Sequence, residues 1–543
     1  MLAWAKRMTS ASATTPPVAL IAALLAAAPM LVTATELIIR RPVLYLDGDG
    51  AIDELALMRA GHLAQLVGNY SRFGWSEPGP AWFYALSAVY QPLGRESWAF
   101  FVASLVLQAA AAAMIVWTTW RIGGQALALI ASGVLLVYYG LLGDQVFQIT
   151  WPPFELMLPM ALLLLLSGLA ATGSRPALAG SLVVGSYLVQ THLGTSGAVG
   201  AVVGVAVAYQ VIDAIRQARA REQTPAQRKN SWLLTGGGLA LVVVMWIPPL
   251  INEINGQPRN LNLLWRFFIA NGTERGWRAA FSAVGRYVDV FDFGGLSHYM
   301  QDVAVIDGGY IAATVVFGVL CAALAAAGTL ARDRFAQATG ILLIAATAAV
   351  AYSVRHVVGT VYDYLLLWVT TLPLVLVLGW AELAVHQRAL LLPRVRPAAR
   401  TAIAAAAWVA VIALAAARMA EFVALPPLEP TVEQLSYFAT ATQSALPADR
   451  SQPVLLDVTS LDTWVLAAGV GLQLEKHGYT IRVNPQWTFM FGGAARRQGN
   501  ERWDVVFETA ADASGFAAAN PSARVIASTD TYTLFLVQLA PPP

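Results

Sequence analysis

The sequence predicts a mainly α-helical polytopic membrane protein that carries a C-terminal soluble α/β domain. The chain of 543 residues is 57% hydrophobic and only 12% charged, and long apolar runs with few charges need lipid as their solvent. After residue 422 the pattern changes, because short strand-like runs alternate with a helix-like run. We therefore expect a membrane domain over residues 1–421 and an extracytoplasmic domain over residues 422–543.

Eleven apolar runs approach the length that a helix needs to cross a bilayer, which is about 20 residues. They are residues 17–39, 98–118, 124–142, 153–171, 176–190, 195–212, 232–250, 309–331, 336–354, 361–384 and 401–421. A further run, Pro80–Leu93, is shorter, and the charges of the loops decide how it lies.

If Pro80–Leu93 does not cross, every basic loop falls on one side of the membrane, and the short opposite loops 143–152 and 191–194 carry no Lys or Arg. The positive-inside rule then predicts eleven spans, with the N-terminus inside and the C-terminus outside. Pro80–Leu93 becomes an interfacial or re-entrant helix on the outer face. The basic loop residues are Lys6, Arg7, Arg121, Arg175, Arg216, Arg219, Arg221, Arg228, Lys229, Arg332, Arg334, Arg388, Arg394, Arg396 and Arg400.

This topology leaves three large outer segments: the first outer loop at 40–97, the segment 251–308, and the tail. The tail contains strand-like runs at 454–458, 479–483, 503–508, 523–528 and 531–539 and a helix-like run at 463–478. In 251–308, apolar residues recur at helical spacing between Trp277 and Val288, flanked by Arg275, Arg278 and Arg286. We expect an amphipathic helix at the headgroup level, either as an anchor or as a guide for a carrier lipid.

Composition excludes several classes of function. A net charge of +2 is too small to indicate a nucleic-acid partner. The single cysteine, Cys321, excludes an internal disulfide, a cysteine-based zinc site and an iron–sulfur cluster.

The first outer loop concentrates carboxylates. Asp47, Asp49, Asp53 and Glu54 lie within eight residues, just beyond the first span. Such crowded carboxylates repel one another, which indicates a bound cation, a raised pKa or a polar substrate. For Asp53, Glu54 and Glu77 the alternative is simple capping of helix N-termini, where the helix dipole favours acidic residues.

The same loop resembles actinobacterial membrane glycosyltransferases of the GT-C superfamily, the arabinofuranosyltransferase-, mannosyltransferase- and protein-O-mannosyltransferase-like proteins. The similarity is strong over about 50 residues and looser over the rest of the chain. The matching pieces are Gly48-Asp49, Ala51, Glu54-Leu55, Gly68, Tyr70 to Trp75 and Pro78-Gly79-Pro80. The resemblance implies inverting transfer of a sugar from a polyprenyl-phosphate carrier, with Asp49 as the catalytic acidic residue. Glu77 departs from the pattern, since the resemblance implies His before the PGP.

The chemistry agrees with this assignment. A sugar on a lipid phosphate already has a good leaving group, so the enzyme needs a base for the acceptor hydroxyl, and a carboxylate contributes roughly 10²–10⁴-fold. We expect Asp49 to be that base, with Glu54 and Glu77 as further catalytic residues. The departing phosphate needs cationic or hydrogen-bonding groups.

Candidate substrate-binding residues lie in the first outer loop and at the outer ends of spans. Arg355 there either binds lipid phosphate or snorkels as an anchor. His192, in a QTH segment that again resembles these transferases, binds substrate or is a packing residue. The full set is Asp47, Asp53, Arg72, Asp144, His192, Arg355, His356 and Tyr362. We expect one pocket to join the first outer loop to the span ends with His192 and Arg355.

The expected function is transfer of a sugar from a polyprenyl-phosphate donor to a glycan, lipid or protein acceptor, on the outer face of the plasma membrane. No cofactor is certain from the sequence, and a divalent metal stays open. The main rival is a transporter or flippase of lipid-linked glycans, although such proteins place ionisable residues in mid-span and show repeats. The same composition would also fit a lipid-linked oligosaccharide ligase or a catalytically inactive glycan-binding membrane protein.

Overall fold

The computed structural model describes residues 16–220, 225–256, 258–271, 274–293, 301–387, 397–424 and 433–539. The basic residues Lys6, Arg7, Arg221, Arg388, Arg394 and Arg396 lie outside this part of the chain. The chain divides into two compact units, which are described separately. The membrane unit consists of Met1–Glu36, Ser104–Ile247 and Phe267–Pro426, and the loop–tail unit consists of Leu37–Ala103, Pro248–Arg266 and Pro427–Pro543. The predicted boundary at residues 421 and 422 stays a prediction.

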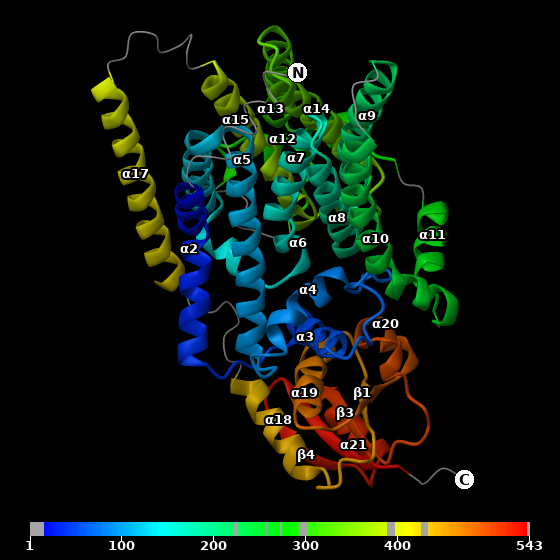
Figure 1. Ribbon diagram of the computed structural model, residues 1–543. Helices are drawn as coiled ribbons and strands as arrows, with labels where there is room; N and C mark the ends of the chain where they lie inside the picture. Colours follow the sequence, from blue (N-terminus) through cyan, green and yellow to red (C-terminus); the bar gives the residue numbers. More distant parts are fainter. Residues whose placement is uncertain are drawn as a thin grey trace. The chain divides into compact units, whose positions relative to one another are not determined.

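The membrane unit is a bundle of helices, and three of its helices continue into the loop–tail unit (Figure 1). These three are α2 (Pro16–Arg40), α5 (Ser97–Leu142) and α10 (Pro225–Asn255). The other helices of the bundle are α6 (Pro152–Glu155), α7 (Met157–Ala171), α8 (Arg175–Thr191), α9 (Ser196–Ala220), α12 (Trp277–Val288), α13 (Gly308–Leu330), α14 (Arg334–Arg355), α15 (Thr371–His386) and α17 (Pro397–Ala424). A further helix, α11 (Asn260–Ala270), begins in the loop–tail unit and ends in the membrane unit.

The predicted polytopic α-helical fold is confirmed. Within the described residues, nine helices are long and apolar enough to cross a membrane. One of them, α5, contains two of the predicted spans, 98–118 and 124–142. Gly124, with a φ of 73°, breaks the helix between them. Another predicted span, 176–190, forms the 17-residue helix α8. All eleven predicted runs are therefore helical, while their sidedness stays a prediction.

Pro80–Leu93 forms a helix that is too short to span. The helix α4 covers Ala81–Tyr90, ten residues, and begins directly after Pro80. At about 1.5 Å per residue it is about 15 Å long, roughly half of the hydrocarbon core. The loop charges predict the same result, and the place of α4 at a membrane interface stays a prediction.

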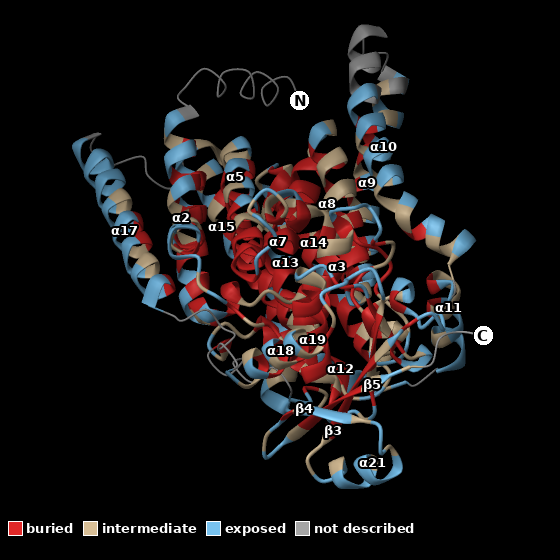
Figure 2. Ribbon diagram, turned by 90° about the horizontal axis from the view of Figure 1, so that it is seen from below, coloured by how far each residue is buried: buried red, intermediate tan, exposed pale blue. Residues whose placement is uncertain are grey.

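The centre of the membrane unit is α7, whose sequence is apolar on every face. Of the most apolar window in Pro152–Ala171, 94% is buried, whereas the corresponding figure for Ala398–Ala424 is 11%. Figure 2 shows the contrast, with α7 red and much of α17 pale blue. A helix that is apolar all round belongs inside a protein or a bilayer, and here α7 packs against α8, α9 and α14.

The amphipathic helix predicted around residues 277–288 is present as α12, but its apolar face packs against other helices of the protein. Ala280, Val284 and Tyr287 are fully buried, and α12 packs against α13 and α14. The helices meet so closely that a Cβ on Gly285 would lie 1.7 Å from the carbonyl oxygen of Tyr310. Protein therefore covers most of the face that the sequence assigns to the headgroup region.

The tail folds as a five-stranded mixed sheet in the order β2-β1-β3-β5-β4. β1 pairs in parallel with β2 and β3, and β5 pairs antiparallel with β3 and β4. The strands are β1 (Val454–Val458), β2 (Ile481–Val483), β3 (Trp503–Thr509), β4 (Arg524–Ser528) and β5 (Tyr532–Gln538), and the helices are α18 (Glu433–Ala445), α19 (Trp464–Lys476), α20 (Thr488–Phe491) and α21 (Ala513–Ala519). The strands and α19 match the predicted runs, whereas α18, α20 and α21 were not predicted.

Candidate active site

Asp49 lies in the first turn of the helix α3 (Gly48–Ala60), in the loop–tail unit. The chain reaches this turn through an extended Asp47 and through Gly48, whose φ of +47° suits glycine. The free backbone N–H groups and the dipole of a helix N-terminus favour a carboxylate at this position. The sequence Asp-Gly-Asp thus places two carboxylates side by side at the start of one helix.

The motif from Tyr70 to Trp75 folds as a tight hairpin. The backbone N–H of Ser71 donates to the carbonyl of Trp75 at 2.7 Å, and the N–H of Glu77 donates to the carbonyl of Asn69 at 2.7 Å. Gly74, with a φ of +81°, makes the turn. The hairpin holds Tyr70 so that its hydroxyl donates a hydrogen bond to the Oδ1 atom of Asp49.

The tail supports Tyr70 from its other side. The ring of Tyr70 meets Phe489 edge-on at 5.9 Å and Trp464 at 6.5 Å between ring centroids. Such edge-to-face pairs stabilise by about 0.5–1.5 kcal/mol beyond their buried area. Residues some 400 positions apart in the sequence therefore position the donor to Asp49.

Asp53 stands one turn after Asp49 and is only 1% exposed. The amide of Asn69 donates to its Oδ2 at 3.4 Å, while its buried Oδ1 has no hydrogen-bond partner among the described residues. Burial and the charge of Asp49 raise the pKa of Asp53 well above its usual range. Burial also raises the pKa of Asp49, and the hydrogen bond from Tyr70 opposes that rise. Both carboxyl groups are therefore shifted toward the protonated form, Asp53 more strongly than Asp49.

Helix capping does not explain Asp47. Asp47 occupies the N-cap position of α3, yet its side chain makes no capping hydrogen bond. Its carboxylate is partly exposed, and burial raises its pKa.

The Glu54 carboxylate is buried and holds hydrogen bonds inside the loop–tail unit. It is fully buried, and its two oxygens accept hydrogen bonds from Tyr90 at 2.8 Å and from Ser97 at 2.7 Å. The Nζ atom of Lys476, at the end of α19, forms an ion pair with Oε1 at 2.7 Å. This arrangement ties α3 to the tail and supports a positioning role for Glu54.

Glu77 closes the base of the hairpin. It is 8% exposed, and its carbonyl accepts from the N–H of Gly68 at 2.9 Å. The amide side chain of Asn260, at the start of α11, pairs with the backbone of Ser76 through two hydrogen bonds of 2.8 Å each. At the tip of the hairpin Arg72 is exposed and lies over the ring of Phe73 at 5.0 Å.

The remaining candidates belong to the membrane unit. Asp144 is buried and pairs with Arg418 at 2.9 Å, and Arg418 also contacts Glu421 at 2.7 Å. Burial is the main cause that raises the pKa of Asp144 to about 7. His192 caps the C-terminal end of α8 and is 9% exposed.

Arg355 and His356 are brought together around Glu274. Arg355 donates to the Glu274 carboxylate at 3.0 Å and lies 4.3 Å over the ring of Trp277. The Nε2 atom of His356 is 3.7 Å from the same carboxylate. Tyr362 stacks on Tyr364 at 5.7 Å between centroids. These contacts hold Arg355 within the protein, and the predicted pocket shared with the first outer loop stays a prediction.

Sequence reasoning missed a carboxylate, Glu155. Glu155 is fully buried, Ser104 donates to its Oε1, and its Oε2 has no hydrogen-bond partner among the described residues. The buried Oε1 of Gln190, on α8, also has no hydrogen-bond partner among the described residues. The signal was present, because an ionisable residue inside an apolar span is a functional candidate by default. Lys476 was missed because its partner Glu54 lies far away in the sequence. Tyr70 stands in the matching motif of the first outer loop, but its hydrogen bond to Asp49 was not predicted.

The carboxylates of the loop–tail unit, Asp47 and Asp49 among them, offer the hard oxygen ligands that divalent cations such as Ca²⁺ and Mg²⁺ prefer. Among the described residues, however, the group of three side chains with metal-ligand spacing is Asp333, Glu382 and His386, in the membrane unit. The metal hypothesis for the first outer loop therefore gains no geometric support.

The described part of the chain combines a helical membrane unit with a small α/β tail, and this class of fold is found among solved structures. The particular proteins that show it are two crystal structures of ArnT from Cupriavidus metallidurans. The structure bound to undecaprenyl phosphate is 14% identical, has a TM-score of 0.55, and covers 94% of this chain and 97% of that chain. The apo structure is 15% identical with a TM-score of 0.53. No family model and no curated protein matches the chain.

Proposed function

We propose that this protein transfers a sugar from a polyprenyl-phosphate donor to a hydroxyl acceptor on the outer face of the plasma membrane. One observation carries the proposal. Asp49, at a helix N-terminus, accepts a hydrogen bond from Tyr70 and stands next to the buried Asp53, which favours the protonated form. The likeness of the fold to ArnT, one structure of which is bound to undecaprenyl phosphate, supports the donor class.

In the proposed reaction Asp49 is the general base. It takes the proton of the acceptor hydroxyl as that oxygen attacks the anomeric carbon of the sugar. The bond between that carbon and the phosphate oxygen breaks, and the polyprenyl phosphate leaves with the electron pair. One direct displacement inverts the anomeric configuration. The hydrogen bond from Tyr70 orients Asp49, and a neutral Asp53 leaves the single charge on Asp49.

The departing phosphate needs a cation, and two arginines are candidates. Arg72 is exposed at the tip of the hairpin that also carries Tyr70. Arg355 binds Glu274 in the membrane unit. We propose Arg72 as the first contact for the phosphate, because it lies on the hairpin whose Tyr70 donates to Asp49 and its guanidinium geometry suits two phosphate oxygens.

The tail has a supporting role in this proposal. Trp464 and Phe489 pack on Tyr70, and Lys476 neutralises Glu54. These contacts hold α3 and the hairpin in one arrangement. We propose that the tail completes the site in this way, whether the acceptor is a glycan, a lipid or a protein.

The test is a transfer assay with the purified full-length protein and a panel of polyprenyl-phosphate sugars. We expect one donor to be consumed, and Asp49→Asn to lower kcat by roughly 10²–10⁴-fold with donor binding kept, because the amide keeps the size but is no base. Asp47→Asn is the matched control and should lose less. A fully active Asp49→Asn enzyme would refute the assignment, and equal losses at both positions would indicate a shared metal site.

A further inference from the structure

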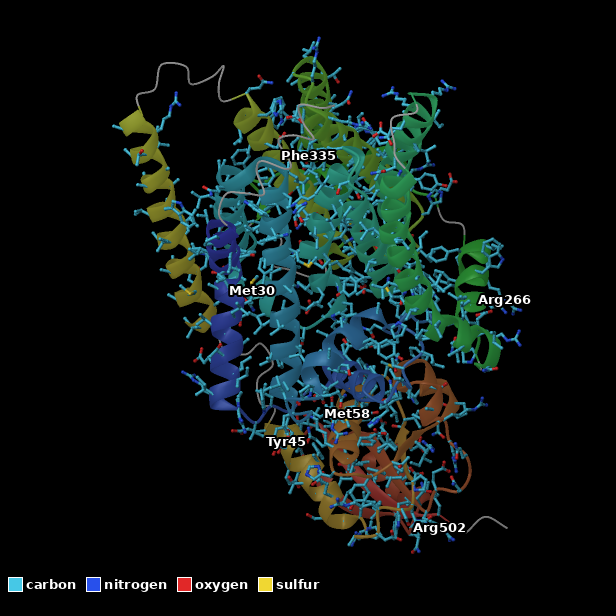
Figure 3. All side chains as sticks on the ribbon, in the orientation of Figure 1. Met30, Tyr45, Met58, Arg266, Phe335 and Arg502 are labelled. Carbon is cyan, nitrogen blue, oxygen red and sulfur yellow. The ribbon has the colours of Figure 1, made fainter. Side chains whose placement is uncertain are left out.

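Three side chains with metal-binding chemistry meet in the membrane unit, apart from every residue used above. Asp333 precedes α14, while Glu382 and His386 lie four residues apart on α15 and so share one face of that helix. One ligand atom from each lies within 4.8 Å of the others. Phe335, labelled in Figure 3, shows the end of α14 at which this cluster lies.

The local fold presents Asp333 to the other two side chains. The N–H of Asp333 donates to the carbonyl of Gly328 at 2.7 Å, which closes the turn between α13 and α14. Its Oδ1 then caps α14 by accepting from the N–H of Ala336 at 3.1 Å. The second oxygen, Oδ2, is left for the cluster and lies 3.5 Å from Nδ1 of His386.

The helices that carry the three ligands pack tightly. A Cβ on Gly379 of α15 would lie 2.7 Å from the side chain of Leu324 on α13. A Cβ on Gly328 would lie 2.4 Å from the backbone nitrogen of Gln337 on α14. Small residues at these contacts therefore bring α15 close to α13, and the end of α13 close to the start of α14.

The cluster holds two buried carboxyl groups beside one imidazole. Asp333 and Glu382 are each 5% exposed, and Oδ2 of Asp333 and Oε2 of Glu382 have no hydrogen-bond partner among the described residues. The adjacent cation Arg334 is committed to Asp213, with contacts of 2.9 and 2.8 Å. Buried carboxylate oxygens without partners are costly, so the cluster favours a further cation or a shared proton.

We propose that Asp333, Glu382 and His386 bind a divalent first-row metal ion of the zinc or manganese kind. Two carboxylates and one imidazole suit these ions, and three protein ligands leave a position for water. With metal–ligand distances of about 2.0–2.2 Å, a bound ion would bring the ligand atoms to about 3.5 Å from one another. The ion ties the α13–α14 turn to the end of α15 and takes no part in sugar transfer.

The test uses the full-length protein in detergent, purified without a histidine tag and stripped with a chelator. After loading with zinc or manganese ions and desalting, elemental analysis should find close to one ion per chain. The melting temperature should rise with the ion and fall again with the chelator. A free ion concentration of 100 times the Kd stabilises the folded state by about 2.7 kcal/mol, so the change in melting temperature is measurable.

Variants locate the ion. Glu382→Gln and His386→Gln should each lose the bound ion and the metal-dependent rise in melting temperature. Asp213→Asn is the matched control, because it breaks the adjacent ion pair with Arg334 but leaves the three ligands in place. It should keep the ion.

The proposal is overturned if the stripped and loaded wild-type protein holds no ion, or if the ion remains in both ligand variants. The first outcome means that the carboxylates share a proton instead. If Glu382→Gln fails to fold, His386→Gln decides alone, since the His386 side chain is 33% exposed and its loss is milder.

Discussion

At the scale of single residues, the proposed base depends on one hydroxyl group. The hydrogen bond from Tyr70 opposes the rise that burial causes in the pKa of Asp49. Tyr70→Phe removes that hydrogen bond and should raise this pKa further. A base acts only when deprotonated, so activity present above its pKa is lost as the pH falls through it. The acidic limb of the kcat/KM profile should therefore move to higher pH.

Tyr84→Phe is the control for this profile. Tyr84 lies in the same unit and donates to the carbonyl of Gln65 at 2.8 Å, without contact to Asp49. Its removal should leave the acidic limb in place. An unchanged profile in Tyr70→Phe, or the same shift in both variants, would contradict the proposed coupling.

Variants of the ion pair between Glu54 and Lys476 test whether Glu54 has a positioning role or a catalytic role. The side chains are 0% and 12% exposed, and removing one partner of a buried pair costs about 3–5 kcal/mol. Glu54→Gln should therefore lower the melting temperature strongly, while the kcat of the folded fraction changes little. The double variant Glu54→Gln, Lys476→Met should recover part of the stability, because no charge is left unpaired.

Glu421→Gln serves as the control for stability, since Glu421 is 54% exposed and such pairs contribute about 0–1 kcal/mol. If Glu54→Gln kept wild-type stability and lost turnover, Glu54 would belong to the chemistry after all.

At the scale of elements, the first turn of α3 sets the direction in which Asp49 points. Gly48→Ala places a side chain at a φ of +47°, which costs roughly 1–2 kcal/mol or forces the turn to shift. We expect lower stability together with lower kcat. Unfolding measurements and the transfer assay check both parts.

The same helix supplies a matched substitution. Gly50 lies in the first turn too, and a Cβ there meets Leu46 at an ordinary 3.6 Å. Because alanine is the better helix former, Gly50→Ala should stabilise by about 0.5–1 kcal/mol and leave turnover near normal. If the two substitutions behaved alike, the special backbone of Gly48 would have no role.

At the scale of the whole molecule, the proposed function requires the tail and the first outer loop on one side of the membrane. Reporter fusions after Arg228 and after Pro430 should report inside and outside respectively, because basic loops stay in the cytoplasm. Two fusions on the same side would contradict the topology. The result also decides whether the Asp49 site faces the outer leaflet.

The sequence by itself determined most of the elements of this protein. Apolar runs of span length and strand-like runs in the tail are local patterns, and each became the expected helix or strand, whereas α18, α20 and α21 were not predicted. Asp49 could also be identified from the sequence, because the crowded acidic motif and the resemblance to GT-C glycosyltransferases lie in one short segment. Local patterns persist because backbone hydrogen bonding and the solvent act on neighbouring residues.

The tertiary structure alone decided which distant residues meet. It placed Trp464 and Phe489 on Tyr70, Lys476 on Glu54, and Asp333 beside Glu382 and His386. It also buried the apolar face of α12 in protein where the pattern indicated a lipid surface, because hydrophobic burial has no preference between the two partners. Contacts of this kind depend on packing between residues hundreds of positions apart, and the hydrophobic periodicity of the sequence does not predict them.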